Sequence, residues 1–556
     1  MPSTRRLPAP ALDADACVIG GGPNGLVAAN ALADAGWDVV LVEGHRLGGA
    51  VRSERRRPET VTDLFSAFYP LAAASPVIKA MELEQHGLSW SHAPVVVAHP
   101  ADAMAGVAAS LHRDVETTAR GLDHDHRGDG DAWRELVAQY QAIRAPLLDA
   151  LFSPFPPVAP GIRLARALGS EAIRTARTLL LPAHRMGEEH FGGQHGRLLI
   201  MGNALHADIP PTAPGSGMFG WLLSMLGQDV GYPVPTGGAG ELPAALTRRA
   251  ESLGVQVLEG TPVDQVLTNA SGRAVGVALA DGRLVRARRA VVGAIDAVVL
   301  LRDLVPTGVV PPRLLEDLRH FERDVPTVKV NWTLPRTPRW TSSPTADAGT
   351  VHIGADIDGA ISWNADLERG ALPMRPFMLV GQMTTADRTR STDGSESLWA
   401  YTHLPRGATV ERLGVAALGQ MVHTTADHMA QVLEEHAPGF ADGALDHFVQ
   451  GPEDLFRADP NLIDGGVNGG TAQLHQQLFF RPVPGVGRPG TAVPGLYLGG
   501  ASAHPGGGVH GAGGWNAAVA CLADNGALGR LRRAASSAVQ ARLYRDRPPW
   551  SAEPGR

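Results

Sequence analysis

The stretch Asp15–Arg52, DACVIGGGPNGLVAANALADAGWDVVLVEGHRLGGAVR, decides the fold of this 556-residue chain. Its first apolar run, Ala16–Ile19, predicts a buried parallel strand because it is short, continuous and followed by glycines. Helix-forming residues occupy Leu26–Ala35, and a second apolar strand over Asp38–Val42 ends at Glu43. Strand, glycine-rich turn, helix, strand and acid in this order predict the first unit of a nucleotide-binding α/β fold.

The glycines of this stretch have the spacing of a dinucleotide-binding fingerprint, Gly20-x-Gly22-x-x-Gly25. Glycine lets the backbone approach a pyrophosphate, and the N-terminus of the following helix attracts that anion. Glu43 stands where an acid accepts hydrogen bonds from the ribose hydroxyls and repels a 2′-phosphate. The pattern therefore predicts NAD or FAD, with contacts from Gly20, Gly22, Pro23, Asn24, Gly25 and Glu43. The alternative is a tight turn that binds nothing.

The continuation RLGGAVR, residues 46–52, favours FAD over NAD. A second glycine pair exposes backbone along an extended dinucleotide, and an arginine supplies a cation near its phosphates. A nicotinamide site needs neither feature. The competing interpretation of Arg46 is a solvated surface side chain. The further residues expected to contact FAD are Gly44, Arg46, Gly48, Gly49, Ala50 and Val51.

Composition and charge exclude several classes of protein. The net charge of −7 and the isoelectric point near 6.3 argue against a nucleic-acid partner. Two cysteines, Cys17 and Cys521, are too few for a disulfide or zinc framework and are expected to be buried fillers in a reducing cytoplasm. We find neither a signal-peptide core nor an apolar run long enough to span a membrane, so the expected location is cytoplasmic.

One polar segment, Gly121–Ala132, carries candidate metal ligands. It reads as an exposed loop, and crowded ligands in a flexible loop without a partner cluster are more often solvated. We therefore predict no metal site from its acids and histidines: His124, Asp125, His126 and Asp129.

The chain is too long for a single core, and its element order predicts an α/β protein with two interleaved domains. We expect a Rossmann-like FAD-binding domain of the glutathione reductase type from three segments: 14–75, 235–300 and 490–535. Two further segments are expected to form an α+β substrate domain, helical over 76–234 and built from a mixed or antiparallel sheet with helix over 301–489. Residues 536–556 are expected to form a tail.

A basic amphipathic helix is predicted over Gly161–Leu181. Such a helix can lie on an anionic membrane surface, which would make the protein peripheral on a membrane. A lid helix packed on the protein core is the competing interpretation and the one that we favour from sequence. Its arginines on one side are Arg163, Arg166, Arg174 and Arg177.

A second glycine-rich approach to a helix lies near the C-terminus, at Gly506-x-Gly508-x-x-Gly511. No second strand ending in an acid follows, so this is not a second nucleotide domain. Backbone N–H groups and the dipole at such a helix N-terminus stabilise a reduced, anionic flavin ring. We therefore expect the flavin edge here, contacted by Gly500, Ala501, Val509, His510, Gly511 and Ala512. The adenine is expected near Val263.

Three segments carry a resemblance that spans nearly the whole chain. They are VIGGGPNGLVAANALADAG…VVLVEGHRLGGAV, the central DRTRSTDGSESLWAYTHLP, and GGVNGGTAQLHQQLFFRPVPG…GLYLGGASAHPGGGVHGAGGWNAA. Together they resemble the phytoene desaturase-related family of FAD-dependent oxidoreductases, in the branch of the pyridine nucleotide-disulphide oxidoreductase domain-containing protein 2 type. The resemblance implies one FAD, interleaved domains and a channel for a lipophilic substrate, but not that the substrate is a carotenoid.

The expected activity is that of a FAD-dependent dehydrogenase or desaturase. It would act on a C–C bond of a lipophilic small molecule, with isoprenoid-like compounds as a candidate class, and oxygen or a quinone would re-oxidise the flavin. A flavin amine oxidase and a flavin-stabilised regulatory protein without enzyme activity remain as alternatives. The catalytic candidates are His510 and Lys329, which the amine oxidases suggest could face the flavin; a surface lysine and a structural histidine are the competing interpretations.

Overall fold

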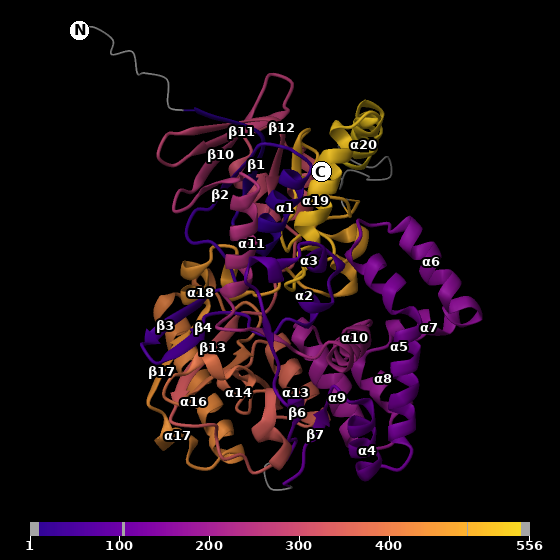
Figure 1. Cartoon of the computed structure of the whole chain (residues 1–556), viewed down its shortest axis with the longest axis vertical. Helices are drawn as coiled ribbons and strands as arrows, with labels where there is room; N and C mark the ends of the chain where they lie inside the picture. The colour runs from indigo at the N-terminus through magenta and orange to yellow at the C-terminus, as the bar shows by residue number, and fades with distance from the viewer. Residues whose placement is uncertain (1–10, 103–105, 486, 546–556) are drawn as a thin grey trace, which may run out of the picture.

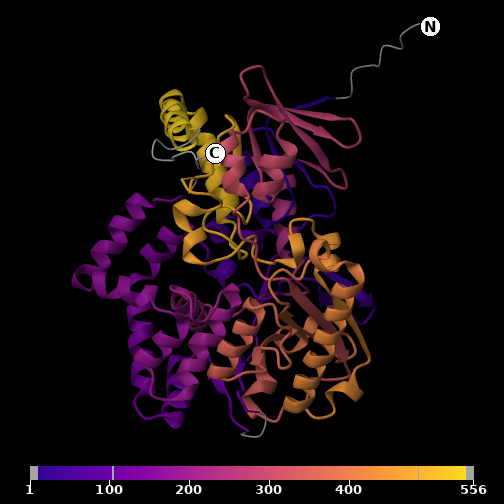
Figure 2. The same ribbon diagram turned by 180° about the vertical axis from the view of Figure 1, so that it is seen from behind.

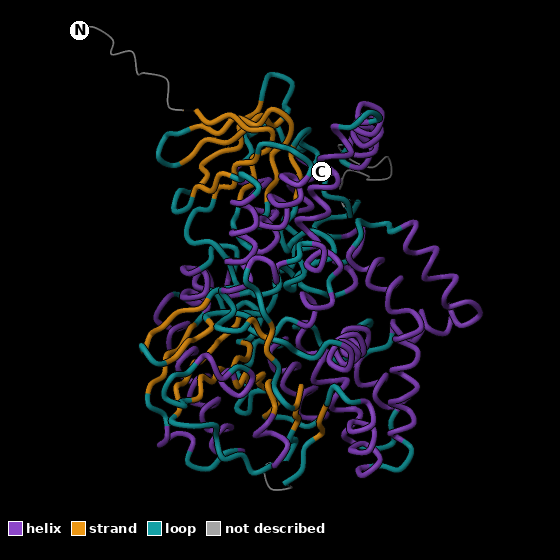
Figure 3. The backbone as a smooth tube through the Cα atoms, in the orientation of Figure 1, coloured by secondary structure: helices purple, strands orange, loops and turns teal. Residues whose placement is uncertain are grey.

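The computed structural model describes residues 11–102, 106–485 and 487–545. Two seven-stranded sheets and a group of helices make up most of it (Figure 1). Figure 3 shows the two sheets as separate groups of strands, with the helical group beside the second sheet.

The first sheet has β1 at its centre and the order β10-β11-β12-β1-β2-β9, with β18 also paired to β12. The pairs of β1 with β2 and β12 are parallel, and Val18 lies opposite both Leu41 and Val292. Only β10, β11 and β12 form an antiparallel meander. Because the inner parallel strands are covered on both faces, they are continuous apolar runs, as predicted. The strands are β1 (Ala11–Ile19), β2 (Val39–Val42), β9 (Gln256–Leu258), β10 (Val263–Thr268), β11 (Ala274–Leu279), β12 (Leu284–Gly293) and β18 (Leu496–Leu498).

Three helices from distant parts of the chain cover one face of the first sheet: α1 (Pro23–Asp34), α11 (Glu241–Ser252) and α19 (Ala512–Asn525). Leu26 of α1 and Leu246 of α11 share a fully buried core with Leu41 of β2. The other face packs against the meander and α12 (Pro312–Leu318). Cys17 and Cys521 are both buried and unpaired; Cys521 lies in α19.

The second sheet has the order β17-β13-β16-β15-β14-β6-β7. It is mixed, because β14 pairs with β6 in parallel and its other neighbours are antiparallel. Residues 76–234 were expected to be helical, and β6 and β7 correct this: the apolar run of β6 is fully buried and completes the sheet. The strands are β6 (Val95–His99), β7 (Ala109–Leu111), β13 (Thr327–Leu334), β14 (Ala348–Ile353), β15 (Met378–Gln382), β16 (Glu396–His403) and β17 (Asp446–Gln450).

The helical group lies beside this sheet and consists of α4 (Val115–Asp125), α5 (Asp129–Phe152), α6 (Val158–Leu168), α7 (Ala172–Leu180), α8 (Ala183–His190), α9 (Gln194–Ala204) and α10 (Ser216–Asp229). The predicted single helix over 161–181 is two helices, α6 and α7, because Gly169 between them has φ of 52°.

The predicted polar loop over 121–132 is wrong, since α4 and α5 occupy most of it. Its acids bond to nearby backbone: the Asp129 carboxylate accepts the N–H groups of Gly192 and Gly193 at 2.8 and 2.9 Å, and Asp125 accepts that of His195 at 2.8 Å. Within the described ranges no group of His, Cys, Asp or Glu side chains is arranged to hold a metal ion.

The expected tail is also corrected, because α20 (Gly529–Leu543) extends into it. Residues 529–543 contain no proline and only one glycine, Gly529 at the start, so no residue within this segment interrupts a helix. Among the described residues, no helix combines the length and apolar character that crossing a bilayer requires. The remaining elements are β3 (Ser53–Arg57), β4 (Thr60–Asp63), β5 (Trp90–Ser91), β8 (Val234–Pro235), α2 (Pro70–Ala74), α3 (Pro76–Ala80), α13 (Ile357–Glu368), α14 (Met383–Ala386), α15 (Val410–Leu413), α16 (Val415–His436), α17 (Phe440–Gly443) and α18 (Pro452–Ala458).

Candidate functional site

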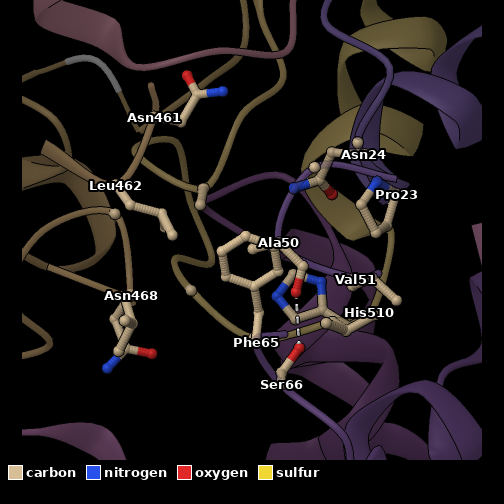
Figure 4. A pocket seen from close by; sticks show the side chains of 18 of the residues that line it. Pro23, Asn24, Ala50, Val51, Phe65, Ser66, Asn461, Leu462, Asn468 and His510 are labelled. Atoms are coloured by element: carbon tan, nitrogen blue, oxygen red, sulfur yellow. Dashed lines mark hydrogen bonds between the residues drawn. The ribbon is translucent and has the colours of Figure 1, made fainter. Parts of the chain in front are cut away.

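A cavity of about 420 Å³ is lined by residues from both sheets and from the helical group. In Figure 4, Asn461, Leu462 and Asn468 lie on one side of it, and Pro23, Asn24 and His510 lie across from them. Most of the predicted FAD contacts line this cavity: Gly22, Pro23, Asn24, Glu43, Arg46, Gly49, Ala50, Val51, Ala501, Val509, His510 and Gly511.

The N-terminus of α1 opens onto this cavity. Gly22 is its N-cap residue, Pro23 begins the helix, and no side chain among the described residues caps it. A Cβ on Gly22 would have Gly49 Cα, 3.9 Å away, as its nearest neighbour, so the two glycine loops leave room between backbone segments. Uncapped N–H groups at a helix N-terminus bind an anion such as a pyrophosphate.

Glu43 follows β2 and lines the same cavity. Its Oε2 accepts the N–H of Gly21 at 2.6 Å and its Oε1 accepts that of His45 at 2.7 Å. Burial raises the pKa of this carboxyl, although the two backbone donors oppose the change. The side chain thus holds the first glycine loop in place and presents a carboxylate edge to the cavity.

The other residues predicted to contact FAD do not line the cavity. Gly25 packs so closely that a Cβ would be 1.8 Å from the carbonyl oxygen of Gly20, and a Cβ on Gly500 would be 2.4 Å from that of Ile295. These glycines are therefore required by protein packing, whatever binds nearby. The predicted residues that are not in the cavity lining are Gly20, Gly25, Gly44, Gly48, Val263, Gly500 and Ala512.

The segment before α19 brings Val509, His510 and Gly511 to the cavity. The N–H of Ala512 donates to Nδ1 of His510 at 3.0 Å, and that of Gly514 to Oδ1 of Asn24 at 3.4 Å. These two N–H groups lie at the N-terminus of α19, where donors to the flavin were expected, and both are hydrogen-bonded within the protein. Burial lowers the pKa of His510 to about 4, so its ring is neutral at physiological pH.

Lys329 is buried in β13, with 4% of its surface exposed, and lines the cavity. The interpretation as a surface lysine is therefore wrong. Its Nζ donates to the carbonyl oxygen of Asp63 and lies 5.4 Å from the ring centroid of Trp399. Burial lowers the pKa of this amine to about 7. A neutral amine, able to accept a proton, is therefore well populated near physiological pH.

A polar cluster around Asp208 was missed from sequence. The Asp208 side chain, 1% exposed, lines the cavity; its Oδ1 lies 2.9 Å from Nε2 of His403, and its Oδ2 accepts from Nδ2 of Asn468 at 2.6 Å. Its backbone has φ of 54°, which is uncommon for a residue other than glycine. The available signal was that Asp208 is the only acid in the apolar stretch Leu198–Leu226.

These features fit FAD. The uncapped α1, the open space between Gly22 and Gly49, and the Glu43 carboxylate form a cradle for a dinucleotide. Beyond them the cavity continues to Lys329 and to apolar side chains of α5 and α10.

Comparison with known proteins agrees with this reading. The family model for flavin containing amine oxidoreductase matches residues 24–398. The mouse pyridine nucleotide-disulfide oxidoreductase domain-containing protein 2 is 27% identical over 92% of this chain and 93% of its own length. The hydroxyneurosporene desaturase of Cereibacter sphaeroides is 28% identical over 91% and 97%. The solved structure of an oxidoreductase from Methanosarcina mazei has a TM-score of 0.58 at 13% identity, covering 91% of this chain and 99% of that one.

The family match extends over more than half of the chain and starts within the glycine loop that lines the cavity. It confirms FAD as the cofactor and the Rossmann-like α/β fold class. The similarity to these two relatives is consistent with a phytoene desaturase-related branch. The chain belongs to the flavin containing amine oxidoreductase family and is a FAD-dependent oxidoreductase.

Proposed function

We propose that the protein is a dehydrogenase that converts a C–C single bond of a lipophilic small molecule into a double bond. The observation that carries this is the apolar inner wall of the cavity, formed by Leu71, Leu151, Phe152, Phe219, Leu222 and Leu223. Such a wall binds hydrocarbon by removing its surface from water. The name of the hydroxyneurosporene desaturase relative supports an isoprenoid-like substrate.

In this reaction one carbon loses a hydride and its neighbour loses a proton. When bound, FAD supplies the hydride acceptor. The chain would hold FAD through the α1 N-terminus, Glu43 and Arg46, and would orient the substrate against the apolar wall. What the protein must add is a group that accepts the proton.

Lys329 suits that role better than His510. The neutral amine of Lys329 keeps its lone pair available, because Nζ donates to the Asp63 carbonyl and lines the cavity. In His510 the lone pair of Nδ1 already accepts the Ala512 N–H, which leaves Nε2 protonated in the neutral ring. We therefore propose that Lys329 accepts the proton and that His510 only lines the cavity.

Amine oxidation is the second candidate, and Trp399 and Tyr401 favour it, because aromatic rings attract cations. The rings stack with centroids 6.1 Å and planes 27° apart. However, they are two residues apart on β16 and form one wall instead of two facing walls. The face of Trp399 is also already close to Lys329. A carbon–carbon substrate is therefore the better proposal.

Anaerobic mixing of the FAD-loaded protein with a panel of isoprenoids, fatty acyl compounds and amines tests the proposal. We expect an isoprenoid or acyl compound to bleach the flavin absorbance and to yield a product that is two hydrogens poorer. Bleaching by amines alone would support the amine oxidase instead. If no compound of the panel is oxidised, the proposed function fails, and the result supports a flavin-stabilised regulatory protein without enzyme activity.

We also propose oxygen or a quinone as the electron acceptor. The described residues contain one dinucleotide-binding unit, and the glycine loop before α19 lacks the following strand and acid that a second would need. Substrate-reduced protein should therefore regain its absorbance with oxygen or a quinone. Rapid bleaching by NADH or NADPH without substrate would contradict this.

Substitution of Glu43 by Ala should weaken FAD binding by about 10- to 100-fold. The change removes an acceptor from two loop N–H groups as well as from the expected ribose hydroxyls, and a hydrogen bond to a charged group contributes roughly 1.5–3 kcal/mol. Titration of the apoprotein with FAD, followed by flavin fluorescence, measures the effect. Glu259→Ala is the matched control, because among the described residues that carboxylate accepts only the Leu47 N–H, and it lies outside the cavity lining. Equal losses in both variants would show that Glu43 acts only on the loop.

A further inference from the structure

Helices α6, α7 and α20 expose large apolar side chains to solvent. No residue of α6 or α7 is buried, and only Gly529 is buried in α20. Leu164, Leu168 and Leu179 rest partly on the helical core, while other apolar side chains point outward. The exposed ones on α6 and α7 are Val158 (63%), Ile162 (48%), Ile173 (84%) and Leu180 (56%), and those on α20 are Leu531 (70%), Val539 (57%) and Leu543 (45%).

These helices lie on one side of the molecule. Figures 1 and 2 show α20 above the α6–α7 pair on the same edge in both views. The exposed turn Leu478–Phe480 lies between them. The ring of Phe479 is 5.6 Å from that of Phe155, just before α6. On the other side the N–H of Gly485 donates to Phe479 O at 2.6 Å, and a Cβ on Gly485 would lie 2.6 Å from Leu543 of α20. We call α6, α7, α20 and this turn the arginine-rich face.

The charge of this face is opposite to that of the whole chain, whose net charge is −7. Helix α20 contains Arg530, Arg532, Arg533 and Arg542 and no acid, and α6 and α7 contain Arg163, Arg166, Arg174 and Arg177. The nearby acids are already paired: Asp149 with Arg163, Glu171 with Arg174, Glu189 with Arg177 and Asp524 with Arg532. In the described part of the chain, Arg166, Arg530 and Arg542 have no ion-pair partner.

The cavity wall continues into this face along the chain. Leu151 and Phe152, at the end of α5, line the cavity and precede Phe155 and α6. Gln477 lines the cavity and precedes the exposed turn at Leu478. Two chain segments that line the cavity thus lead directly into this face.

We propose that the arginine-rich face binds the surface of an anionic lipid bilayer. Exposed apolar side chains among unpaired arginines fit the interface between acyl chains and anionic headgroups. A second copy of the chain is a poorer occupant, because the same arginines would face one another. If the proposed function is right, on which this last step rests, lipophilic substrate passes between bilayer and cavity on this side.

Co-sedimentation of the FAD-loaded protein with vesicles tests the proposal. We expect binding at least about tenfold stronger to phosphatidylcholine containing about one-third phosphatidylserine than to phosphatidylcholine alone, and weaker binding in about 0.5 M salt. Failure to bind the anionic vesicles overturns the proposal. The measurement needs no substrate, so it stands even if the proposed reaction is wrong.

Two double variants locate the surface. Ile173→Glu with Leu531→Glu should lower vesicle binding about tenfold or more, and Arg166→Glu with Arg530→Glu should remove the preference for anionic lipid. Met374→Glu is the matched control, since Met374 is 76% exposed but lies between α13 and β15. All variants should keep the wild-type flavin spectrum. If the Ile173→Glu, Leu531→Glu variant binds like wild type, the face is wrongly assigned.

Two further measurements separate the other outcomes. Light scattering without vesicles should give the same mass for wild type and the apolar double variant; a dimer that the variant dissociates would show that a second copy covers the face. Once a substrate is known, the double variant should oxidise it more slowly from vesicles but at the wild-type rate from detergent. Equal slowing in both would contradict substrate entry from the bilayer.

Discussion

Substitution of Gly22 by Val should yield a folded protein that purifies without FAD. Gly22 has φ of −72° and ψ of 176°, a backbone conformation that valine adopts readily. Its Cβ would have no protein atom within 3.9 Å, so the new side chain extends into the cavity where the pyrophosphate is expected. We expect FAD affinity to fall by at least about 100-fold, because the ligand would have to shift away from the α1 N-terminus.

The matched control is Gly490→Val. Gly490 also has open space around its Cβ and a backbone that accepts side chains, but it is outside the cavity lining. Both variants should keep the circular dichroism spectrum of the apoprotein, and only Gly22→Val should fail in a FAD titration. Wild-type FAD affinity in Gly22→Val would disprove this cofactor position.

Other glycines give less clear tests. At Gly511 a Cβ would lie 2.9 Å from Val27 and φ is 72°, so a side chain there would disturb the fold itself. Gly192 is also unsuitable as a control position, because a Cβ there would lie 2.2 Å from the His126 ring.

Substitution of Lys329 by Met should lower the rate of substrate oxidation by about 100-fold or more while FAD stays bound. Loss of a positioned proton acceptor typically costs 10²- to 10⁴-fold. In the wild type, the rate of anaerobic flavin bleaching should rise with pH through about 7, because only the unprotonated amine accepts a proton. The variant should show a low rate without this rise. An unchanged rate and pH profile would exclude Lys329 from the chemistry.

The chain offers a matched control, because Lys79 is its only other lysine. Lys79 is exposed on α3 and outside the cavity lining. Lys79→Met should therefore leave the rate and its pH dependence unchanged. A loss in both variants would point to a general effect of removing a positive charge.

The pH dependence of stability gives a second readout for Lys329. Its pKa is lowered in the folded state, so between about 7 and 10.5 the unfolded chain binds more protons than the folded one. This amine therefore makes the folded state gain stability as pH rises across that window, by about 1.4 kcal/mol per pH unit at most. The difference between wild type and Lys329→Met in urea unfolding should show this slope. Parallel curves would mean that the amine is not buried in solution.

Local sequence was sufficient for the cofactor-binding end of the site. The turn at Gly20–Gly25, the uncapped α1 and the acid after β2 all lie in the single segment 20–43, so their spacing alone brings them together. The sequence of β13, TVKVNWTL, also marks a strand locally, because apolar residues alternate with polar ones. Sequence could not separate glycines that line the cavity from those, such as Gly25 and Gly500, that only permit close packing.

The substrate end of the site depended on tertiary structure. Lys329 on β13 and Asp208 beyond α9 reach the cavity through tertiary packing, since their burial is determined by strands and helices far away in the chain. The pKa of Lys329 follows from that burial and therefore could not be foreseen. By itself the sequence determined the fold class and FAD, because these rest on short-range spacing, and it indicated the family through the resemblance of three segments along the chain. Tertiary packing decided which side chains share the cavity and which apolar residues stay exposed, because both depend on long-range contacts.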